Sequence, residues 1–394
     1  MKKIYLDYAA TTPVDSKVLE AMQPYWIAKS GNPSSLHFWG QETKKALENS
    51  RKIVAKFLYC QPEEVIFLSC ATEANNLVLK GVVEAWKSKN PQKTPHIIVS
   101  SIEHHCVLDS AKHLAKQGVE VSWLTVDKYG LVDPKEVKKL IKKNTVLVSV
   151  MYGNNEVGTI EPIKEISKII DLRSKIDDLS ICFHTDAVQA IQYLDCNVQN
   201  LKVDFLSASS HKFYGPKGIG FLYIKKGINI IRQQDGGGQE FGLRAGTENI
   251  PEIVGMAKAL ELAAKNKHKE KERLEKLRDY LIKGLLKLIP QAQLTGHPEK
   301  RLPHIASVVI PEAEGEAMLL HLDDLGIAVS SGSACTSGNL EPSHVLLAMG
   351  IRPEIAHGSL RISLGKSTTK KDLDYLIKVL PKIVKKLRKM APKL

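Results

Sequence analysis

The sequence predicts an α/β fold with a large, mainly parallel sheet, followed by a smaller α+β domain. Short β-branched runs alternate with amphipathic stretches of helical length through roughly the first 260 residues. Several of these runs are apolar on successive residues, which suits strands that helices cover on both faces. From about Pro251 the pattern changes to a long helical stretch rich in Ala, Leu, Lys and Glu. This order is typical of a large α/β domain with a second domain at its end.

Seven short apolar runs are the candidate strands of the large sheet. They cover residues 65–68, 97–101, 119–124, 146–150, 181–185, 204–208 and 220–224.

The elements predicted for the smaller domain come after the break at Pro290. They are a strand at 305–310, a helix at 314–325, a Ser/Gly-rich loop at 330–342, a strand at 359–364 and a final helix. In the final helix leucine and isoleucine recur at spacings of three and four, so one apolar stripe is expected to pack on a core.

The composition excludes fibrous, disordered and disulfide-stapled classes of protein. The chain has 394 residues, of which 43% are hydrophobic and 25% charged, as in ordinary globular proteins. It has no apolar stretch of about 18 residues, as a transmembrane helix would need. Asp7 interrupts the N-terminal residues before they could form the apolar core of a signal peptide. We therefore expect a cytoplasmic protein. Six scattered cysteines without a C-x-x-C pair argue against disulfides and a local zinc site, so no metal site is expected.

The net charge of +13 raises nucleic-acid binding as an alternative function. The most lopsided segment, from Lys366 to Leu394, holds nine Lys and one Arg against two Asp. No aromatic-interleaved basic motif accompanies this charge, so nucleic acid is not expected to be a direct substrate.

Lys212 is the first candidate catalytic residue. It follows an apolar strand and the small residues Ser207 to Ser210, and it precedes a Gly/Pro-rich turn, so it is presented at the end of a sheet strand. A lysine that forms a Schiff base needs a partly desolvated place and small neighbours that admit a planar cofactor. A solvent-facing loop lysine is the alternative.

Asp186 ends the neighbouring apolar run 181–185. A carboxylate at a buried strand end is costly unless a cation or donors face it, and a pyridinium nitrogen is such a partner. Capping of the next helix is the alternative interpretation.

Further polar groups follow other strands at the same edge of the sheet. Ala71 and Thr72 begin a helix after residues 65–68, where backbone N–H groups suit a phosphate. His104 follows residues 97–101 and is placed to stack on an aromatic ring and move protons, while Asn155 offers an amide. Ligands bind at this edge in α/β sheets.

Cys335 is the one cysteine in a loop of small polar residues, 330–342. A thiol in such a setting can take a sulfur atom from a substrate and carry it as a persulfide. An incidental loop cysteine is the alternative.

Taken together, the motifs resemble those of the NifS/IscS-type cysteine desulfurases. They are Asp7-Tyr-Ala-Ala-Thr-Thr-Pro13, Gly31-Asn-Pro-Ser-Ser35, Ala71-Thr-Glu73, Glu103-His104, Asn154-Asn-Glu156, His184-Thr-Asp186-Ala-Val-Gln189, Ser210-His-Lys-Phe-Tyr-Gly-Pro-Lys-Gly-Ile-Gly220, Arg244-Ala-Gly-Thr247 and Ser330-Ser-Gly-Ser-Ala-Cys-Thr-Ser337. The resemblance runs from residue 5 to about residue 365 in the family's order.

The resemblance implies a fold-type I pyridoxal 5'-phosphate enzyme of the class V aminotransferase family, working as a homodimer. It also implies three segments: an N-terminal segment 1–13 packed with the small domain, a large cofactor-binding domain 14–259, and a small domain 260–394 carrying the cysteine loop.

By motif match, Lys212 holds the cofactor as a Schiff base, Asp186 faces the pyridine nitrogen, Gln189 lies on the phenolic oxygen side and His104 stacks on the ring. The phosphate is expected to bind Ala71, Thr72, Ser209, His211 and, from the other subunit, Thr247. Asn155 lies beside cofactor and substrate, and Arg361 pairs with the substrate carboxylate.

The implied activity removes sulfur from L-cysteine, giving L-alanine and a persulfide on Cys335. Lys212 takes the Cα proton, and the sulfur passes to acceptors: an iron-sulfur scaffold protein and tRNA-thiolation proteins. A selenocysteine lyase or another class V aminotransferase, neither of which needs Cys335, is the alternative.

Three residues depart from the family pattern without removing a catalytic group. Cys70 stands where glycine is common and is expected to narrow the phosphate turn. Gly153 replaces a small aliphatic residue, and Cys106 adds a thiol close to His104.

Overall fold

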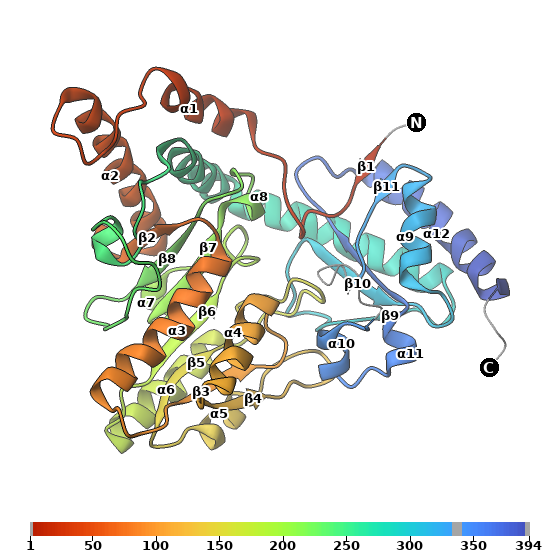
Figure 1. The fold of residues 1–394 in the computed structure, drawn as a ribbon. Helices are drawn as coiled ribbons and strands as arrows, with labels where there is room; N and C mark the ends of the chain where they lie inside the picture. Colours follow the sequence, from red (N-terminus) through yellow and green to blue (C-terminus); the bar gives the residue numbers. More distant parts are fainter. Residues whose placement is uncertain (1–2, 333–340, 391–394) are drawn as a thin grey trace.

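The computed structural model describes residues 3–332 and 341–390. Figure 1 shows a large sheet flanked by helices on one side of the molecule and two small sheets with their helices on the other.

The large sheet has seven strands in the order β2-β8-β7-β6-β5-β3-β4. Its strands are β2 (Val65–Leu68), β3 (His96–Ser100), β4 (Glu120–Leu124), β5 (Thr145–Ser149), β6 (Cys182–Asp186), β7 (Phe205–Ser209) and β8 (Gly220–Ile224). Strand β8 is antiparallel to both of its neighbours, and the remaining pairs are parallel. All seven predicted strands are confirmed to within one residue at each end.

Helices cover both faces of the sheet, as the unbroken apolar runs predict. Helices α3 (Ala71–Lys89) and α4 (His105–Lys116) bury one face. The other face packs against α2 (Phe38–Leu58), α5 (Pro134–Leu140), α6 (Ile163–Asp177) and the first half of α8 (Ile250–Leu288). Every residue of β3, β5, β7 and β8 is buried.

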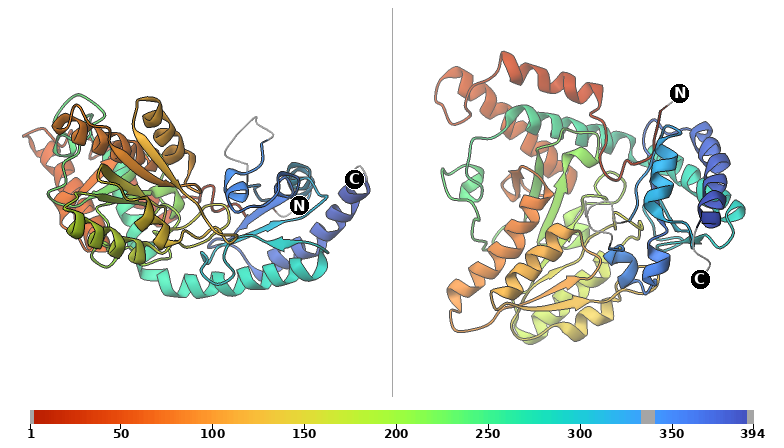
Figure 2. Two further views of the ribbon diagram at one scale, coloured as in Figure 1. Left: turned by 90° about the horizontal axis from the view of Figure 1, so that it is seen from below. Right: turned by 45° about the vertical axis from the view of Figure 1, so that its right-hand side comes forward.

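The second half of α8 belongs to a separate apolar core. There it packs on β10 (Ile305–Val309) and α12 (Lys370–Met390). Figure 2 shows α8 running beneath both halves of the molecule. Strand β10 lies between β12 (Ser359–Ser363) and β9 (Gln293–Leu294) in an antiparallel sheet, with α9 (Gly315–Asp323) nearby. The apolar stripe of α12 is buried from Leu373 to Val384, as predicted.

The N-terminal segment joins the two halves. Strand β1 (Ile4–Tyr5) pairs in parallel with β11 (Ile327–Ala328), a pair that the sequence pattern does not predict. The backbone of Asp7 then bridges to Ser363 of β12, and Thr12 donates its backbone N–H to the His211 carbonyl oxygen at 2.9 Å. Residues 7–12 therefore run from the small sheets to the carboxyl edge of the large sheet.

The remaining elements are short helices and connections. They are α1 (Ser16–Ile27), α7 (Val198–Leu201), α10 (His344–Ala348), α11 (Pro353–Ala356) and the 3₁₀ turns Pro62–Glu64, Ser210–Lys212 and Glu240–Gly242. Among residues 3–332 and 341–390, no helix is long and apolar enough to cross a membrane.

Candidate active site

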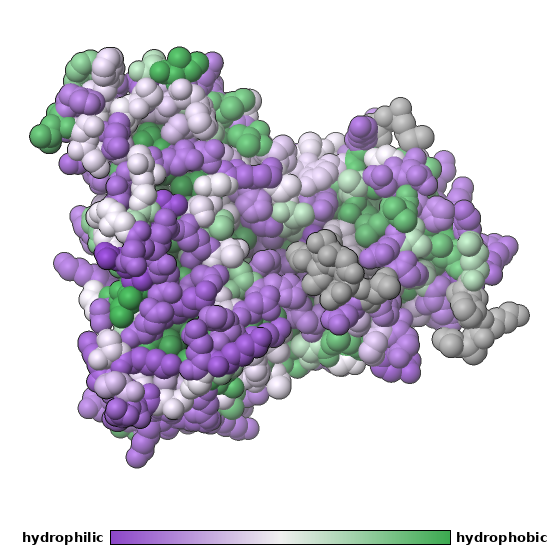
Figure 3. Space-filling model, in the orientation of Figure 1, coloured by the Kyte–Doolittle hydropathy of each residue, from purple (hydrophilic) through white to green (hydrophobic). Residues whose placement is uncertain are grey.

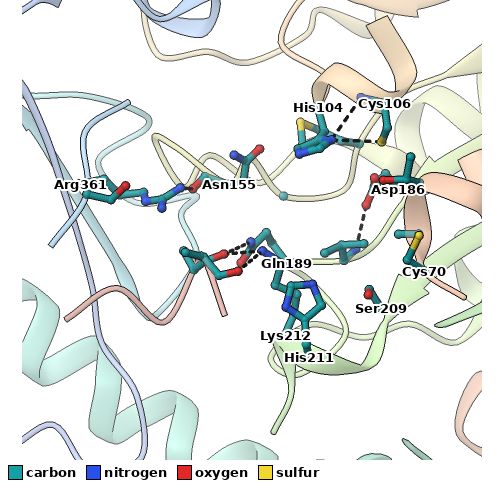
Figure 4. A pocket seen from close by; sticks show the side chains of 18 of the residues that line it. Cys70, His104, Cys106, Asn155, Asp186, Gln189, Ser209, His211, Lys212 and Arg361 are labelled. Atoms are coloured by element: carbon teal, nitrogen blue, oxygen red, sulfur yellow. Dashed lines mark hydrogen bonds between the residues drawn. The ribbon is translucent and has the colours of Figure 1, made fainter. Parts of the chain in front are cut away.

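A cavity of about 370 Å³ lies at the carboxyl edge of the large sheet, next to β12 and the N-terminal segment (Figure 4). Ten residues that the sequence predicts for the site line it. They are Ala71, Thr72, His104, Asn155, Asp186, Gln189, Ser209, His211, Lys212 and Arg361. Thr247 does not line this cavity, and Cys335 lies outside the described residues.

The strand ends explain why these side chains meet. His104 follows β3, Asn155 follows β5, Asp186 ends β6 and Lys212 follows β7. These strands are parallel neighbours or close to one another in the sheet, so their carboxyl ends share one edge. Arg361 comes from β12 instead, which places one wall of the cavity on the small antiparallel sheet.

The ε-amino group of Lys212 lies against the N-terminal segment. Its Nζ donates to the carbonyl oxygens of Ala9 and Ala10 at 2.7 Å each. Gln189 donates from Nε2 to the same Ala9 oxygen at 2.9 Å, and its Oε1 lies 3.3 Å from His304 Nε2. These backbone oxygens therefore hold both polar side chains at one place in the cavity (Figure 4).

Asp186 is 5% exposed and is surrounded by donors. Its Oδ1 accepts from the backbone N–H of Val188 at 2.9 Å, and its Oδ2 accepts from Asn75 Nδ2 at 2.8 Å. The amide oxygen of Asn75 in turn accepts from the Ser207 hydroxyl at 2.5 Å. These two hydrogen bonds offset the cost of burying the Asp186 carboxyl group.

His104 forms the N-cap of α4. Its Nδ1 accepts from the backbone N–H of Cys106 at 3.2 Å and lies 3.1 Å from the Cys106 Sγ. Burial lowers the pKa of His104, with Asp186 opposing and Lys212 reinforcing the shift. The imidazole is therefore neutral near pH 7.

One end of the cavity suits an anion. The 19-residue helix α3 begins there, and its N-cap Cys70 makes no side-chain capping bond within the described part of the chain. Its first N–H groups are therefore available to a phosphate. Ser209 and His211 also line the cavity, and burial, aided by Lys212, lowers the pKa of His211 to about 4. Cys70 itself lines the cavity, as expected for a side chain in this turn.

Arg361 lies on the opposite wall with its side chain 4% exposed. Its Nη2 is 2.9 Å from Asp7 Oδ1, and its Nη1 donates to the Asn155 carbonyl oxygen at 3.0 Å. Its Nε has no hydrogen-bond partner among the described residues. An incoming carboxylate would therefore meet an arginine that two neighbours already orient.

Sequence reasoning assigns no role to Asp7, Ala9, Ala10 or Asn75, although all four contact site residues. Asp7, Ala9 and Ala10 belong to a motif that carries the family resemblance, which is the only signal for them. Asn75 lies one helical turn into α3, and no local pattern marks it.

These groups fit pyridoxal 5'-phosphate. The cavity brings together a lysine amine, a buried and hydrogen-bonded carboxyl group, an imidazole and a helix N-terminus for the phosphate. These are the partners that the aldehyde, the ring nitrogen, the ring face and the phosphate of that cofactor require.

Comparison with known proteins agrees with this geometry. A model of the aminotransferase class-V family matches residues 4–376. Cysteine desulfurase IscS of Dictyoglomus turgidum is 49% identical over 391 residues, which cover 99% of this chain and 97% of that protein.

Solved structures confirm the predicted fold-type I architecture. A NifS-like protein has a TM-score of 0.90 and 40% identity, covering 98% of this chain and 100% of its own. SspA in complex with cysteine has a TM-score of 0.79 and 35% identity, covering 92% of this chain and 99% of its own. Enzymes of this kind depend on pyridoxal 5'-phosphate. The chain belongs to the cysteine desulfurases of the class-V aminotransferase family.

Proposed function

We propose that this protein removes sulfur from L-cysteine, releases L-alanine and leaves a persulfide on Cys335. The observation that carries the proposal is a single cavity that holds Lys212, Asp186 and Arg361. An amine, an anion for the ring nitrogen and a cation for an amino-acid carboxylate are together what a cofactor-dependent reaction at an amino acid's Cα needs.

In this proposal, different residues that line the cavity have different roles. Arg361 binds the substrate carboxylate, and Asn155 lies beside it. Bound pyridoxal 5'-phosphate supplies an electron sink for the pair left when the Cα proton departs. Lys212 takes that proton, and the Ala9 and Ala10 carbonyl oxygens hold its Nζ in place beforehand.

Ala71, Thr72, Ser209 and His211 are proposed to hold the phosphate. Gln189 is proposed to lie on the phenolic oxygen side of the cofactor and His104 against its ring.

The proposed sulfur transfer converts the Cys335 thiol to a persulfide without an external oxidant. The Cys335 thiolate attacks the substrate sulfur, the C–S bond breaks, and its electron pair stays with the carbon, which takes up a proton. Ser330, five residues before Cys335 in the chain, lines the cavity. This position supports the proposal that Cys335 acts on a substrate bound there.

A homodimer is part of the proposal. Large hydrophobic side chains are exposed just before α2, in its first turn and in the 3₁₀ turn 240–242: Leu36 is 92% exposed, Phe38 71%, Trp39 54% and Phe241 55%. Figure 3 shows hydrophobic residues at the surface of the α1–α2 region. Exposed apolar groups of this size mark an interface. Thr247, which does not line its own chain's cavity, is proposed to reach the phosphate of the other subunit. Sedimentation of the purified protein tests the dimer.

The sulfur acceptors are proposed to be an iron-sulfur scaffold protein and tRNA-thiolation proteins, in the cytoplasm. The basic residues of α12 support acidic partners by attraction. We also retain the segments 1–13, 14–259 and 260–394 as proposed domains, with α8 running through the second boundary.

The direct test is an assay with L-cysteine and a thiol reductant. We expect stoichiometric alanine and sulfide from the wild type. Cys335→Ala should abolish sulfide release and keep the visible cofactor band, whereas Lys212→Ala should lose that band. Full sulfide release by Cys335→Ala would rule out the persulfide step. Activity with selenocysteine alone would favour a lyase.

A further inference from the structure

Cys106 contacts three groups of the site at once. Its Sγ lies 3.1 Å from His104 Nδ1 and 3.2 Å from Asn75 Nδ2, and its side chain also hydrogen-bonds Thr72. Asn75 is the same side chain that donates to Asp186. The thiol therefore lies between Thr72, the Asn75 amide and the imidazole of His104. Figure 4 shows Cys106 beside His104.

The direction of each hydrogen bond around Cys106 follows from its fixed donors. Asn75 must turn its NH₂ toward the Asp186 carboxylate, because its oxygen there would repel the carboxylate. The second N–H of that NH₂ group then points to the Cys106 sulfur, which accepts it. The Thr72 hydroxyl also donates to this sulfur, because its hydrogen bond lowers the pKa of Cys106. The S–H proton of Cys106 is therefore left to donate to His104 Nδ1, 3.1 Å away.

The backbone fixes the protonation of His104 independently. The backbone N–H of Cys106 only donates, and it points to His104 Nδ1 at 3.2 Å. Nδ1 therefore carries a lone pair and the ring proton is on Nε2. The N-terminus of the 12-residue helix α4 also disfavours a positive ring at this position.

We propose that Cys106 is a positioning residue whose thiol adds to the backbone N–H in holding His104 as the neutral Nε2–H tautomer, so that His104 serves the reaction as a hydrogen-bond donor and not as a base. The proposal rests on the proposed desulfurase function and deepens it. A neutral ring that donates from Nε2 has no free lone pair facing the cavity. The Cα proton is therefore left to Lys212, and His104 stabilises negative charge that develops near the ring.

The charged and titratable groups around His104 set the size of the expected effect. Asp186 and Asp109 raise its pKa, while Lys212, His105 and His344 are cationic or potentially cationic neighbours that oppose its protonation. All of them stay in place when only the Cys106 side chain is changed. Loss of one donor to Nδ1 removes a hydrogen bond that favours the neutral form. The His104 pKa should then rise by about half to one pH unit.

The test follows the ring nitrogens of His104 by NMR in ¹⁵N-histidine-labelled, cofactor-free protein, with the signal assigned by its absence in His104→Gln. The wild type should show the Nε2–H tautomer. Cys106→Ala, and Cys106→Val as a second donor-free variant of nearly the same volume, should raise the His104 pKa by about half to one unit. Cys106→Ser keeps a donor and should restore the wild-type value.

Cys182→Ala is the matched control, because Cys182 is also a half-buried thiol packed against the same apolar cluster as Cys106 but does not line the cavity. An Nδ1–H signal in the wild type, or the same titration in Cys106→Ala and Cys182→Ala, would overturn the proposal. In the loaded enzyme, the acid limb of kcat/KM for L-cysteine should move to higher pH by the same amount in the donor-free variants. A wild type without desulfurase activity would refute the proposed function and leave the NMR result to decide the tautomer.

Discussion

The buried ion pair between Arg51 and Glu240 gives the sharpest stability prediction. The side chain of Arg51 is 3% exposed and that of Glu240 is 1% exposed. Arg51 Nη1 donates to Glu240 Oε2 at 2.8 Å and Nη2 donates to Oε1 at 2.9 Å. Oε2 also accepts from the Phe67 backbone N–H at 2.8 Å. Both oxygens of this carboxylate therefore accept from buried donors.

Glu240→Gln replaces one of these oxygens with an NH₂ group that must face a donor. The change also removes the buried counter-charge of Arg51 and leaves only the half-exposed Glu48, whose Oε1 lies 3.7 Å from Arg51 Nε. Removal of one partner from such a pair costs about 3–5 kcal/mol. Glu240 and Phe241 have φ angles of 46° and 58°, left-handed values that non-glycine residues hold only under constraint. We therefore expect the turn that precedes Thr247 to loosen as well.

The assay is denaturant unfolding of the holoenzyme, with hydrogen exchange reporting on residues 238–246. The double variant Arg51→Met with Glu240→Met should cost less than either single change, because no unpaired charge remains. Glu42→Gln, in the exposed pair that Glu42 forms with Lys29 at 2.7 Å, is the control and should change stability by less than about 1 kcal/mol. Equal effects of Glu240→Gln and Glu42→Gln, or strictly additive effects in the double variant, would refute the reasoning.

Three further predictions follow from the site and the core. Arg361→Gln should lower kcat/KM for L-cysteine about 100-fold, mainly through KM, because a charge-assisted contact to the substrate carboxylate is lost. Turnover of cysteamine, which has no carboxylate, should change little. An equal loss for both substrates would contradict the assignment of Arg361 to the carboxylate. Burial raises the pKa of Glu161 to about 8, so the folded state keeps a proton that the unfolded state releases near pH 4.5. Relative to Glu161→Gln, the wild type should therefore lose about 4 kcal/mol of unfolding free energy in urea as pH rises from 4.5 to 8.5. A stability difference between the two proteins that does not change with pH would disprove this prediction. Gly220→Ala places a methyl group 2.5 Å from the Ala208 carbonyl oxygen, whereas Gly238→Ala meets nothing within 4 Å; only the first should lower the thermal midpoint and weaken cofactor binding.

The sequence by itself determined the strands of the large sheet and most of the cavity. Most of these strands are local runs rich in β-branched and aromatic residues, and a polar residue that follows such a run lies at a strand end by necessity. Lys212, Asp186 and His104 could therefore be assigned to one edge before any distance was known. The burial of the α12 stripe follows from its spacing in the same way.

Only the tertiary structure decided which groups complete the site across long separations. The carbonyl oxygens of Ala9 and Ala10 meet Lys212 because β1 pairs with β11, and two-residue strands leave no periodic signal. Asn75 reaches Asp186 from one turn inside α3, where a polar residue normally faces solvent. Arg361 meets Asp7 from another sheet. Such contacts depend on how separate elements pack against one another. The residue pattern along a single segment does not encode that packing.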